Sequence, residues 1–158
     1  MGRVSLPQRR RRAREIALQL IYELDLRPDL DSDEAIDMYP WDEEEADVVE
    51  YARFLVSASI KHTEEIDSML REYIVGWRTE RMVAVDRASI KLALCEGLIE
   101  RRVPIAVAVS EAVELTKMFG TVESSRFVNG VLGRIIRALD ATSVEEPSND
   151  KNHIGEKT

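Results

Sequence analysis

The sequence predicts a compact all-α domain of about seven helices, on the strength of three observations. Apolar residues recur three and four positions apart in successive segments, which is the spacing of one helical face. No segment shows the sustained alternation of apolar and polar residues that is typical of a half-buried strand. No internal repeat of fixed period is present, which disfavours a solenoid. The length of 158 residues and the hydrophobic content of 44% are sufficient for one buried core.

The first helix is predicted to end at Leu26. Its apolar residues, from Ala13 to Leu24, occupy positions that share one helical face. Pro7 fits an early turn, because the amide hydrogen that proline lacks would have no partner there. Pro28 cannot continue a helix and therefore ends this one. The stretch "PQRRRRARE" thus places its five arginines in the opening turns of the helix.

Two further helices are predicted after an acidic, turn-rich stretch. This stretch allows one short helix over residues 33–38, and a longer apolar stripe predicts a helix over residues 43–61. Thr63 is predicted to be the N-cap of the next helix, because two acids follow it. Gly76 lies just past the predicted end of that helix.

The centre of the chain predicts a buried helix. Residues 82–100 are apolar or small nearly all round the helical wheel, so this segment is expected at the centre of the fold. Cys95 within it is interpreted as a small core residue. Pro104 is predicted to begin the following helix, which runs to Phe119.

The last helix is predicted to be capped by Ser124 or Ser125. The dipeptide Asn129-Gly130 within it is typical of a β-hairpin, but the flanking apolar residues follow a helical period. Glycines at 130 and 133 inside a helix cost about 1 kcal/mol each relative to alanine. This cost indicates a close approach at Gly130 and Gly133, either by another helix or by a ligand.

Charge is distributed unevenly along a chain whose formal net charge is −8. Residues 1–14 contain six arginines and no acid, whereas residues 25–50 contain twelve acids and one arginine. Arginines at a helix start oppose the helix dipole and repel one another, so a structural role would favour acids there. We expect the guanidinium groups of Arg10, Arg11 and Arg14 to project away from the apolar stripe and to bind phosphates. A basic segment that only aids solubility is the alternative.

A second group of basic and aromatic residues lies on either side of the expected start of the last helix. Its members are Lys117, Phe119, Arg126 and Phe127. The unstacked bases of single-stranded RNA rest on aromatic rings while arginines contact the phosphates. Ordinary core packing is the alternative for both phenylalanines.

Catalytic and metal-binding motifs are absent from the sequence. One cysteine, two isolated histidines and no glycine-rich phosphate loop leave no familiar constellation for catalysis. We therefore predict a binding protein and not an enzyme, with no metal and no cofactor. No apolar run reaches the roughly 18 residues that a membrane span requires, and the basic N-terminus leads into a charged amphipathic pattern, so we expect no signal peptide. We expect a cytosolic protein without a membrane partner.

Three ordered motifs resemble the NusB family of bacterial transcription antitermination factors. Residues 103–134, "VPIAVAVSEAVELTKMFGTVESSRFVNGVLGR", are similar to the C-terminal signature of that family. The stretches "RRRAREIALQLIYE" and "VDRASIKLALCE" resemble its first and central helices. Two departures are "SEA" where the family often shows "NEA", and "VESSRF" where an additional acid is common. The resemblance covers almost the whole chain between Gln8 and Leu139.

The resemblance implies an all-helical fold of two small helical subdomains and a function in antitermination. It implies binding of boxA, a single-stranded leader element of ribosomal RNA transcripts. It also implies pairing with NusE, a small-subunit ribosomal protein, within the antitermination complex of RNA polymerase. Tyr22 and Asp86 match positions that face NusE in the family. The alternatives are a residue at the edge of the core for Tyr22 and a first-turn acid that stabilises its helix dipole for Asp86. The implied RNA-facing group is Arg9, Arg10, Arg11, Arg12, Arg14, Phe119, Arg126 and Phe127.

Two other binding functions stay open at this point. A helical protein–protein adaptor would use the basic segment to dock on an acidic protein without contacting RNA. Binding of duplex DNA by a helix-turn-helix is disfavoured, because the basic residues cluster near a chain terminus. The sequence does not decide between a monomer and a homodimer. We expect a basic arm over residues 1–8, one helical domain over 9–140 and a disordered tail over 141–158.

Overall fold

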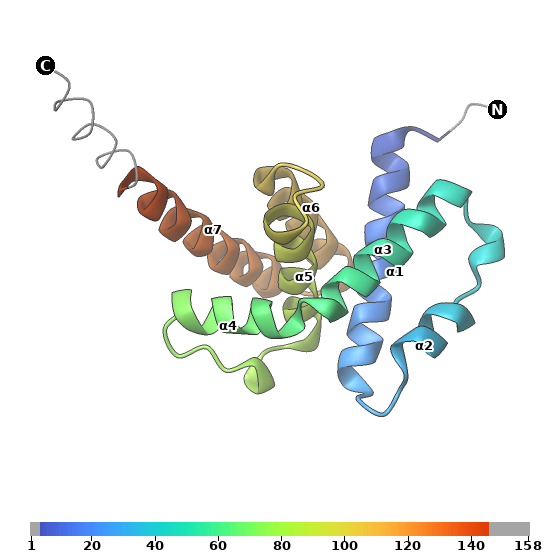
Figure 1. Ribbon diagram of the computed structural model, residues 1–158, viewed down its shortest axis with the longest axis horizontal. Coiled ribbons are helices and arrows are strands. Elements are labelled where there is room, and N and C mark those ends of the chain that lie inside the picture. The colour runs from blue at the N-terminus through green and yellow to red at the C-terminus, as the bar shows by residue number, and fades with distance from the viewer. Residues whose placement is uncertain (1–3, 146–158) are drawn as a thin grey trace, which may run out of the picture.

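Helices account for all the regular structure in the part of the chain that the computed structural model describes, which is residues 4–145, with side chains to residue 142. No strand occurs among these residues, so the predicted all-α class is confirmed. Figure 1 shows α1, α2 and α3 on one side of the molecule and α4 to α7 on the other. The α-helices are α1 (Leu6–Leu26), α2 (Ser32–Met38), α3 (Ala46–Lys61), α4 (Thr63–Tyr73), α5 (Ala84–Leu94), α6 (Ile105–Phe119) and α7 (Val122–Glu145).

Two hydrophobic clusters form the core, in agreement with the two predicted helical subdomains. The first cluster lies mainly among α1, α2 and α3, with Leu55 fully buried. The second lies among α4 to α7, with Leu132 fully buried. Helix α5 contributes Leu92 to the first cluster and Leu94 to the second, and Phe54 packs against both. Because α5 and Phe54 are shared, the start of α1 is held in a defined position relative to α6.

Helix α1 begins with a capping box that the sequence analysis missed. The Ser5 Oγ accepts a hydrogen bond from the Gln8 amide at 3.3 Å, and the Ser5 amide donates to Oε1 of Gln8 at 3.1 Å. Pro7 lies in the first turn, as predicted. The basic arm expected over residues 1–8 is therefore helical from Leu6 onward, while residues 1–3 lie outside the described residues.

Two predicted N-caps are wrong. Thr63 lies within α4, where its Oγ1 donates to the Ser59 carbonyl oxygen at 2.9 Å instead of accepting from the backbone ahead of it. Helix α7 begins before Ser124 and Ser125, because the Thr121 Oγ1 accepts a hydrogen bond from the Ser124 amide at 3.1 Å. At α4 the Thr63 hydroxyl bonds a carbonyl oxygen of the preceding helix, and at α7 the Thr121 hydroxyl replaces the two serines as the cap. Sequence spacing revealed neither partner.

The central segment is buried as predicted, but it is not one regular helix. Helix α5 ends at Leu94, and the chain continues as a π turn, η3 (Cys95–Ile99). Cys95 is fully buried, and burial raises the pKa of its thiol to about 11. This confirms its interpretation as a core residue, because a thiol with so high a pKa stays protonated and unreactive.

The close helix approach occurs at Gly97, not at the two glycines of α7. A Cβ at Gly97 would lie 2.7 Å from the Ala108 Cβ and 3.2 Å from the Ile105 Cα, so glycine allows η3 to contact α6. A Cβ at Gly130 would meet nothing within 4 Å, and at Gly133 only the Arg137 side chain lies near. The prediction that another helix approaches these two glycines is therefore wrong, although the helical assignment of Asn129-Gly130 is confirmed.

Helix α7 continues beyond the predicted start of the tail. It extends to Glu145, so the disorder expected from residue 141 is wrong for residues 141–145. Residues 146–158, the rest of the predicted tail, lie outside the described residues.

Residues 4–145 contain neither a membrane-spanning helix nor a metal-binding cluster. None of the helices described is long and apolar enough to cross a membrane. No group of three or more His, Cys, Asp or Glu side chains within this range is placed to hold a metal ion.

Candidate nucleic-acid interface

Acidic side chains near the start of α3 neutralise two of the arginines at the start of α1. The Nε of Arg9 lies 2.5 Å from Oδ2 of Asp47 and 3.6 Å from Oε2 of Glu45. The Nη2 of Arg12 lies 2.6 Å from Oε1 of Glu44. The hydrogen bond from Arg9 lowers the pKa of Asp47, which keeps that carboxylate ionised. These ion pairs offset part of the repulsion within the arginine cluster and link α1 to α3.

Arg10 and Arg11 present their guanidinium groups at the surface in two different ways. Arg11 has 54% of its side chain exposed, and its Nε and Nη2 donate to the two Glu111 oxygens at 3.1 and 3.2 Å. Glu111 is only 17% exposed and the contact is bidentate, so this pair is held more firmly than a fully exposed one, although the Arg11 side chain itself remains open to solvent. The Arg10 guanidinium lies over the Tyr51 ring at 3.9 Å from its centroid and forms no ion pair with any described residue.

Arg14 does not project into solvent with Arg10 and Arg11, so that prediction is wrong. Arg14 is 4% exposed, and its Nε donates to both carboxylate oxygens of Glu96 at 2.8 and 3.0 Å. The Tyr51 hydroxyl also donates to Glu96. Burial and the charge of Glu96 raise the pKa of Tyr51, so its hydroxyl stays protonated and available as this donor. Arg14 is a buried structural residue.

The sequence carries a signal for this buried pair. Glu96 is the one charged residue of the stretch "LALCEGLI", residues 92–99, and it is 1% exposed. A buried carboxylate requires a cationic or hydrogen-bonding partner. The partner could not be chosen from sequence, because Arg14 lies 82 positions away and four neighbouring arginines were equal candidates.

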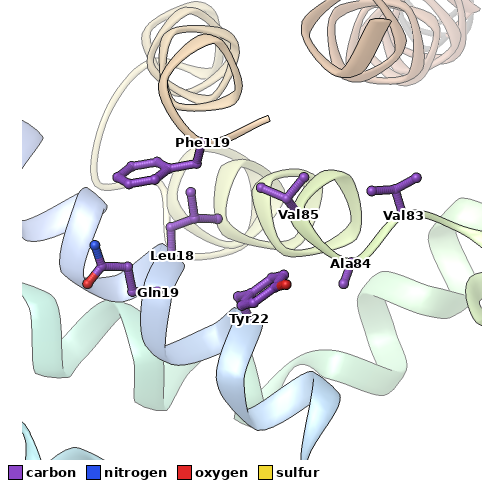
Figure 2. A pocket seen from close by; sticks show the side chains of 7 residues that line it. All are labelled: Leu18, Gln19, Tyr22, Val83, Ala84, Val85 and Phe119. Atoms are coloured by element: carbon purple, nitrogen blue, oxygen red, sulfur yellow. The ribbon is translucent and has the colours of Figure 1, made fainter. Parts of the chain in front are cut away.

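Tyr22 and Phe119 lie across one apolar hollow of about 390 Å³ (Figure 2). Their rings come from α1 and the end of α6, with Leu18 between them in the view. The two aromatic side chains are 40% and 41% exposed. Phe119, which was predicted to face RNA, therefore lies beside Tyr22, which was predicted to face the protein partner. This hollow, called the groove between Tyr22 and Phe119 below, is lined by Leu18, Gln19, Tyr22, Val83, Ala84, Val85 and Phe119.

Comparison with known proteins identifies the family of a chain with this fold and these surfaces. Residues 11–137 match the model of the NusB family. The chain belongs to the NusB family. It is 45% identical over 139 residues to the transcription antitermination protein NusB of Symbiobacterium thermophilum, across 82% of this chain and 90% of that one. The Bacillus subtilis protein of the same name is 38% identical over 127 residues, across 80% of this chain and 94% of that one.

Solved NusB structures share the fold. The chain superposes on a NusB structure from T. maritima with a TM-score of 0.75 and 31% identity, covering 81% of this chain and 90% of that one. It superposes with a TM-score of 0.74 and 28% identity on a crystal structure of antitermination factors NusB and NusE in complex with dsRNA, covering 83% and 98%. Membership of the NusB family confirms the resemblance found in the motifs and the prediction that the protein is not an enzyme.

Asp86 does not lie on the surface that the NusB resemblance suggested. It is 5% exposed, and its Oδ1 has no hydrogen-bond partner among the described residues. Asp86 lies in the first turn of α5, where a carboxylate interacts favourably with the helix dipole. The expectation of an acid presented directly to a partner is wrong for the arrangement seen here. Asp86 is nevertheless next in sequence to a residue of the groove between Tyr22 and Phe119, because Val85 lines that groove.

The remaining predicted residues of this NusB chain lie outside the groove between Tyr22 and Phe119. Phe127 is 37% exposed and stacks on Trp77, with ring centroids 6.3 Å apart and an angle of 10° between the planes. Arg126 is exposed, and Lys117 pairs with Glu114 at 3.1 Å. Trp77 was not predicted to belong to this site, because its position in the loop after α4 gave no indication that its ring would stack on Phe127.

Proposed function

We propose that this NusB-family protein is an RNA-binding transcription antitermination factor that acts with NusE. We place boxA-type single-stranded RNA of nascent ribosomal RNA transcripts as its ligand and processive transcription by RNA polymerase as its effect. Its relatives are transcription antitermination proteins, and its fold is shared by a NusB that was crystallised with NusE and dsRNA. The observation that carries the proposal is the pair of guanidinium groups at the start of α1: Arg11 is exposed, and the partly exposed Arg10 has no ion pair with a described residue.

The RNA strand is proposed to cross the start of α1. Arg10 and Arg11 would donate to phosphates, and Arg11 would exchange its bidentate contact with Glu111 for one with a phosphate. Arg9 and Arg12 add positive potential there, although carboxylates already pair with them. Arg14 is left out of this interface because its guanidinium group is buried.

A second area of RNA contact is proposed around Phe127. Its half-exposed ring, held by Trp77, offers a platform for one unstacked base, and base–aromatic stacking contributes about 1–3 kcal/mol per base. Arg126 and Lys117 lie near this ring in the sequence and would add positive charge along the path of the strand.

Replacing Arg10 and Arg11 together by glutamine is expected to weaken RNA binding and to make it less sensitive to salt. Each phosphate contact to a single strand contributes about 0.7 to the slope of log affinity against log salt concentration, so the slope should fall by about 1.4. Fluorescence anisotropy with a labelled boxA-like single strand at several salt concentrations measures this slope.

The matched control is the double variant Arg27→Gln, Arg71→Gln, which removes the same charge from exposed positions on α4 and after α1. Equal slopes in the two double variants would contradict the proposed path over the start of α1. If NusE binds the protein but RNA binds neither the protein nor the complex, the adaptor function is the correct one.

NusE is proposed to bind the apolar groove between Tyr22 and Phe119. Replacing both residues by alanine removes the two aromatic walls and is expected to lower affinity for NusE by at least about 2 kcal/mol, or roughly thirtyfold. Titration calorimetry with the purified ribosomal protein measures the loss. Phe127→Ala is the control, because Phe127 is exposed to a similar extent but lies outside the groove. An equal loss in the control would assign NusE to another surface.

A further inference from the structure

Two arginines stack on two neighbouring aromatic rings beside the start of α1. The Cζ of Arg10 lies 3.9 Å from the Tyr51 ring centroid, and the Cζ of Arg102 lies 4.0 Å from the Phe54 ring centroid. The Tyr51 and Phe54 centroids are 6.1 Å apart. The four side chains line one hollow of about 180 Å³, together with Asp47 and Glu50. Residues from α1, α3 and the loop between η3 and α6 therefore meet at a single place.

Stacking leaves the hydrogen-bonding edges of both guanidinium groups available. The face of a guanidinium group contacts the ring, whereas its five N–H donors lie in the plane and point outward. Among the described residues, neither Arg10 nor Arg102 forms an ion pair, in contrast to Arg9, Arg11 and Arg12. The hollow thus holds two cations whose in-plane donors have no carboxylate partner in this part of the chain.

The backbone holds Arg102 in position for this arrangement. The Arg102 amide donates to the Glu96 carbonyl oxygen at 2.9 Å, which ties the loop to the π turn η3. Arg101, just before it, has a φ of 52°, a left-handed conformation that a residue with a side chain rarely adopts. Such conformations persist where the surrounding structure imposes them and are concentrated at functional sites. Phe54, under Arg102, packs against both hydrophobic clusters and cannot move freely.

The acids of the hollow are not equivalent. Asp47 is already hydrogen-bonded to Arg9, which compensates its charge. Glu50 is exposed and forms no ion pair with a described residue, so it opposes an anion at the rim. With the charge of Asp47 compensated by Arg9, the hollow is lined by two arginines, Arg10 and Arg102, against the one carboxylate of Glu50, so the local charge favours an anionic ligand.

We propose that Arg10 and Arg102 bind an RNA backbone phosphate at this hollow, which extends the RNA interface from α1 onto the loop between η3 and α6. This inference rests on the proposed RNA-binding function and adds a contact from a part of the chain far from the arginine-rich stretch. The rings of Tyr51 and Phe54 hold the two guanidinium groups in the orientation that binding requires, so little side-chain entropy is lost when the phosphate arrives.

Two substitutions at the hollow are expected to change the affinity for RNA in opposite directions. Arg102→Gln is expected to weaken binding of a mixed-sequence single-stranded RNA dodecamer about tenfold, because a charged hydrogen-bonding contact is lost. The salt slope should fall by about 0.7 in the same variant. Glu50→Gln should tighten binding about two- to fivefold, because the repelling carboxylate is removed. Arg71→Gln, an exposed arginine on α4 on the other side of the molecule, is the control for a general loss of charge (Figure 1).

Anisotropy titrations of the full chain, alone and with NusE, separate the outcomes. A loss in Arg102→Gln that exceeds the loss in Arg71→Gln, with a gain in Glu50→Gln, supports the proposal. If Arg102→Gln behaves as Arg71→Gln while the Arg10, Arg11 double variant still weakens binding, the hollow is not a phosphate site but the proposed function stands. Failure of the unmodified protein to bind the dodecamer, with or without NusE, overturns both. All three side chains are exposed, and an unchanged melting temperature confirms that each variant folds.

Discussion

Replacing Glu96 by leucine is expected to lower the free energy of unfolding by about 3 kcal/mol, because the buried Arg14 guanidinium would lose its close counter-ion and keep only Glu111, at 3.8 Å. Glu96 is 1% exposed and accepts hydrogen bonds from Arg14 and from the Tyr51 hydroxyl, so no water replaces it easily. Urea denaturation followed by circular dichroism at 222 nm measures the loss.

A second substitution shows whether the loss comes from the unpaired charge. The double variant Arg14→Met, Glu96→Leu replaces the ion pair by apolar groups of similar size and is expected to recover most of the stability. Arg11→Gln is the control, because the partly exposed pair with Glu111 should contribute about 1 kcal/mol, less than the buried pair. A single Glu96→Leu variant as stable as Arg11→Gln would show that the buried pair is not needed for folding. The double variant should also retain the RNA salt slope, since Arg14 is placed outside the interface.

Replacing Gly97 by alanine is expected to destabilise the fold by about 1–3 kcal/mol through overpacking. The new Cβ would lie 2.7 Å from the Ala108 Cβ and 3.2 Å from the Ile105 Cα, so α6 would have to move away from η3. Because η3 also carries Glu96, this movement would disturb the buried ion pair as well. Thermal unfolding of the purified variant measures the effect.

Gly130→Ala provides the matched control in the same protein. Its Cβ would meet nothing within 4 Å, and alanine is favoured over glycine inside a helix, so this variant should gain up to about 1 kcal/mol. Destabilisation by both variants to the same extent would contradict the assignment of the close contact to Gly97. A loss of RNA affinity in Gly130→Ala without a loss of stability would point to a ligand at that glycine, the alternative that the sequence left open.

The helices and the family were predictable because their signals lie within short stretches of chain. The apolar stripe between Ala13 and Leu24 depends on neighbours three and four positions apart, and it gives the course of α1 without knowledge of the rest of the fold. The motif "FVNGVL" is equally local, and helical period outweighed the hairpin signal of Asn129-Gly130. The N-caps were less predictable, because no side chain caps α4, and at α7 the hydroxyl with the correct geometry belongs to Thr121 and not to either serine.

The roles of the arginines were not predictable in the same way. The stretch at the start of α1 suggested that its members would act alike, but Arg14 is buried while Arg11 is exposed. Their partners are distant in sequence: Glu96 lies 82 positions from Arg14, and Glu111 lies 100 positions from Arg11. The mutual repulsion inferred from sequence is real, but carboxylates of other helices relieve much of it before any RNA is bound.

By itself, the sequence determined that the chain is an all-α member of a known family and that an arginine-rich helix begins it, since periodicity, composition and short motifs are local properties. Only the tertiary structure decided which guanidinium groups reach the surface, that Phe119 shares a groove with Tyr22, and that Arg102 lies beside Arg10. The physical reason is that the environment of a side chain depends on groups brought near it by packing, and here those groups come from helices far apart in the chain.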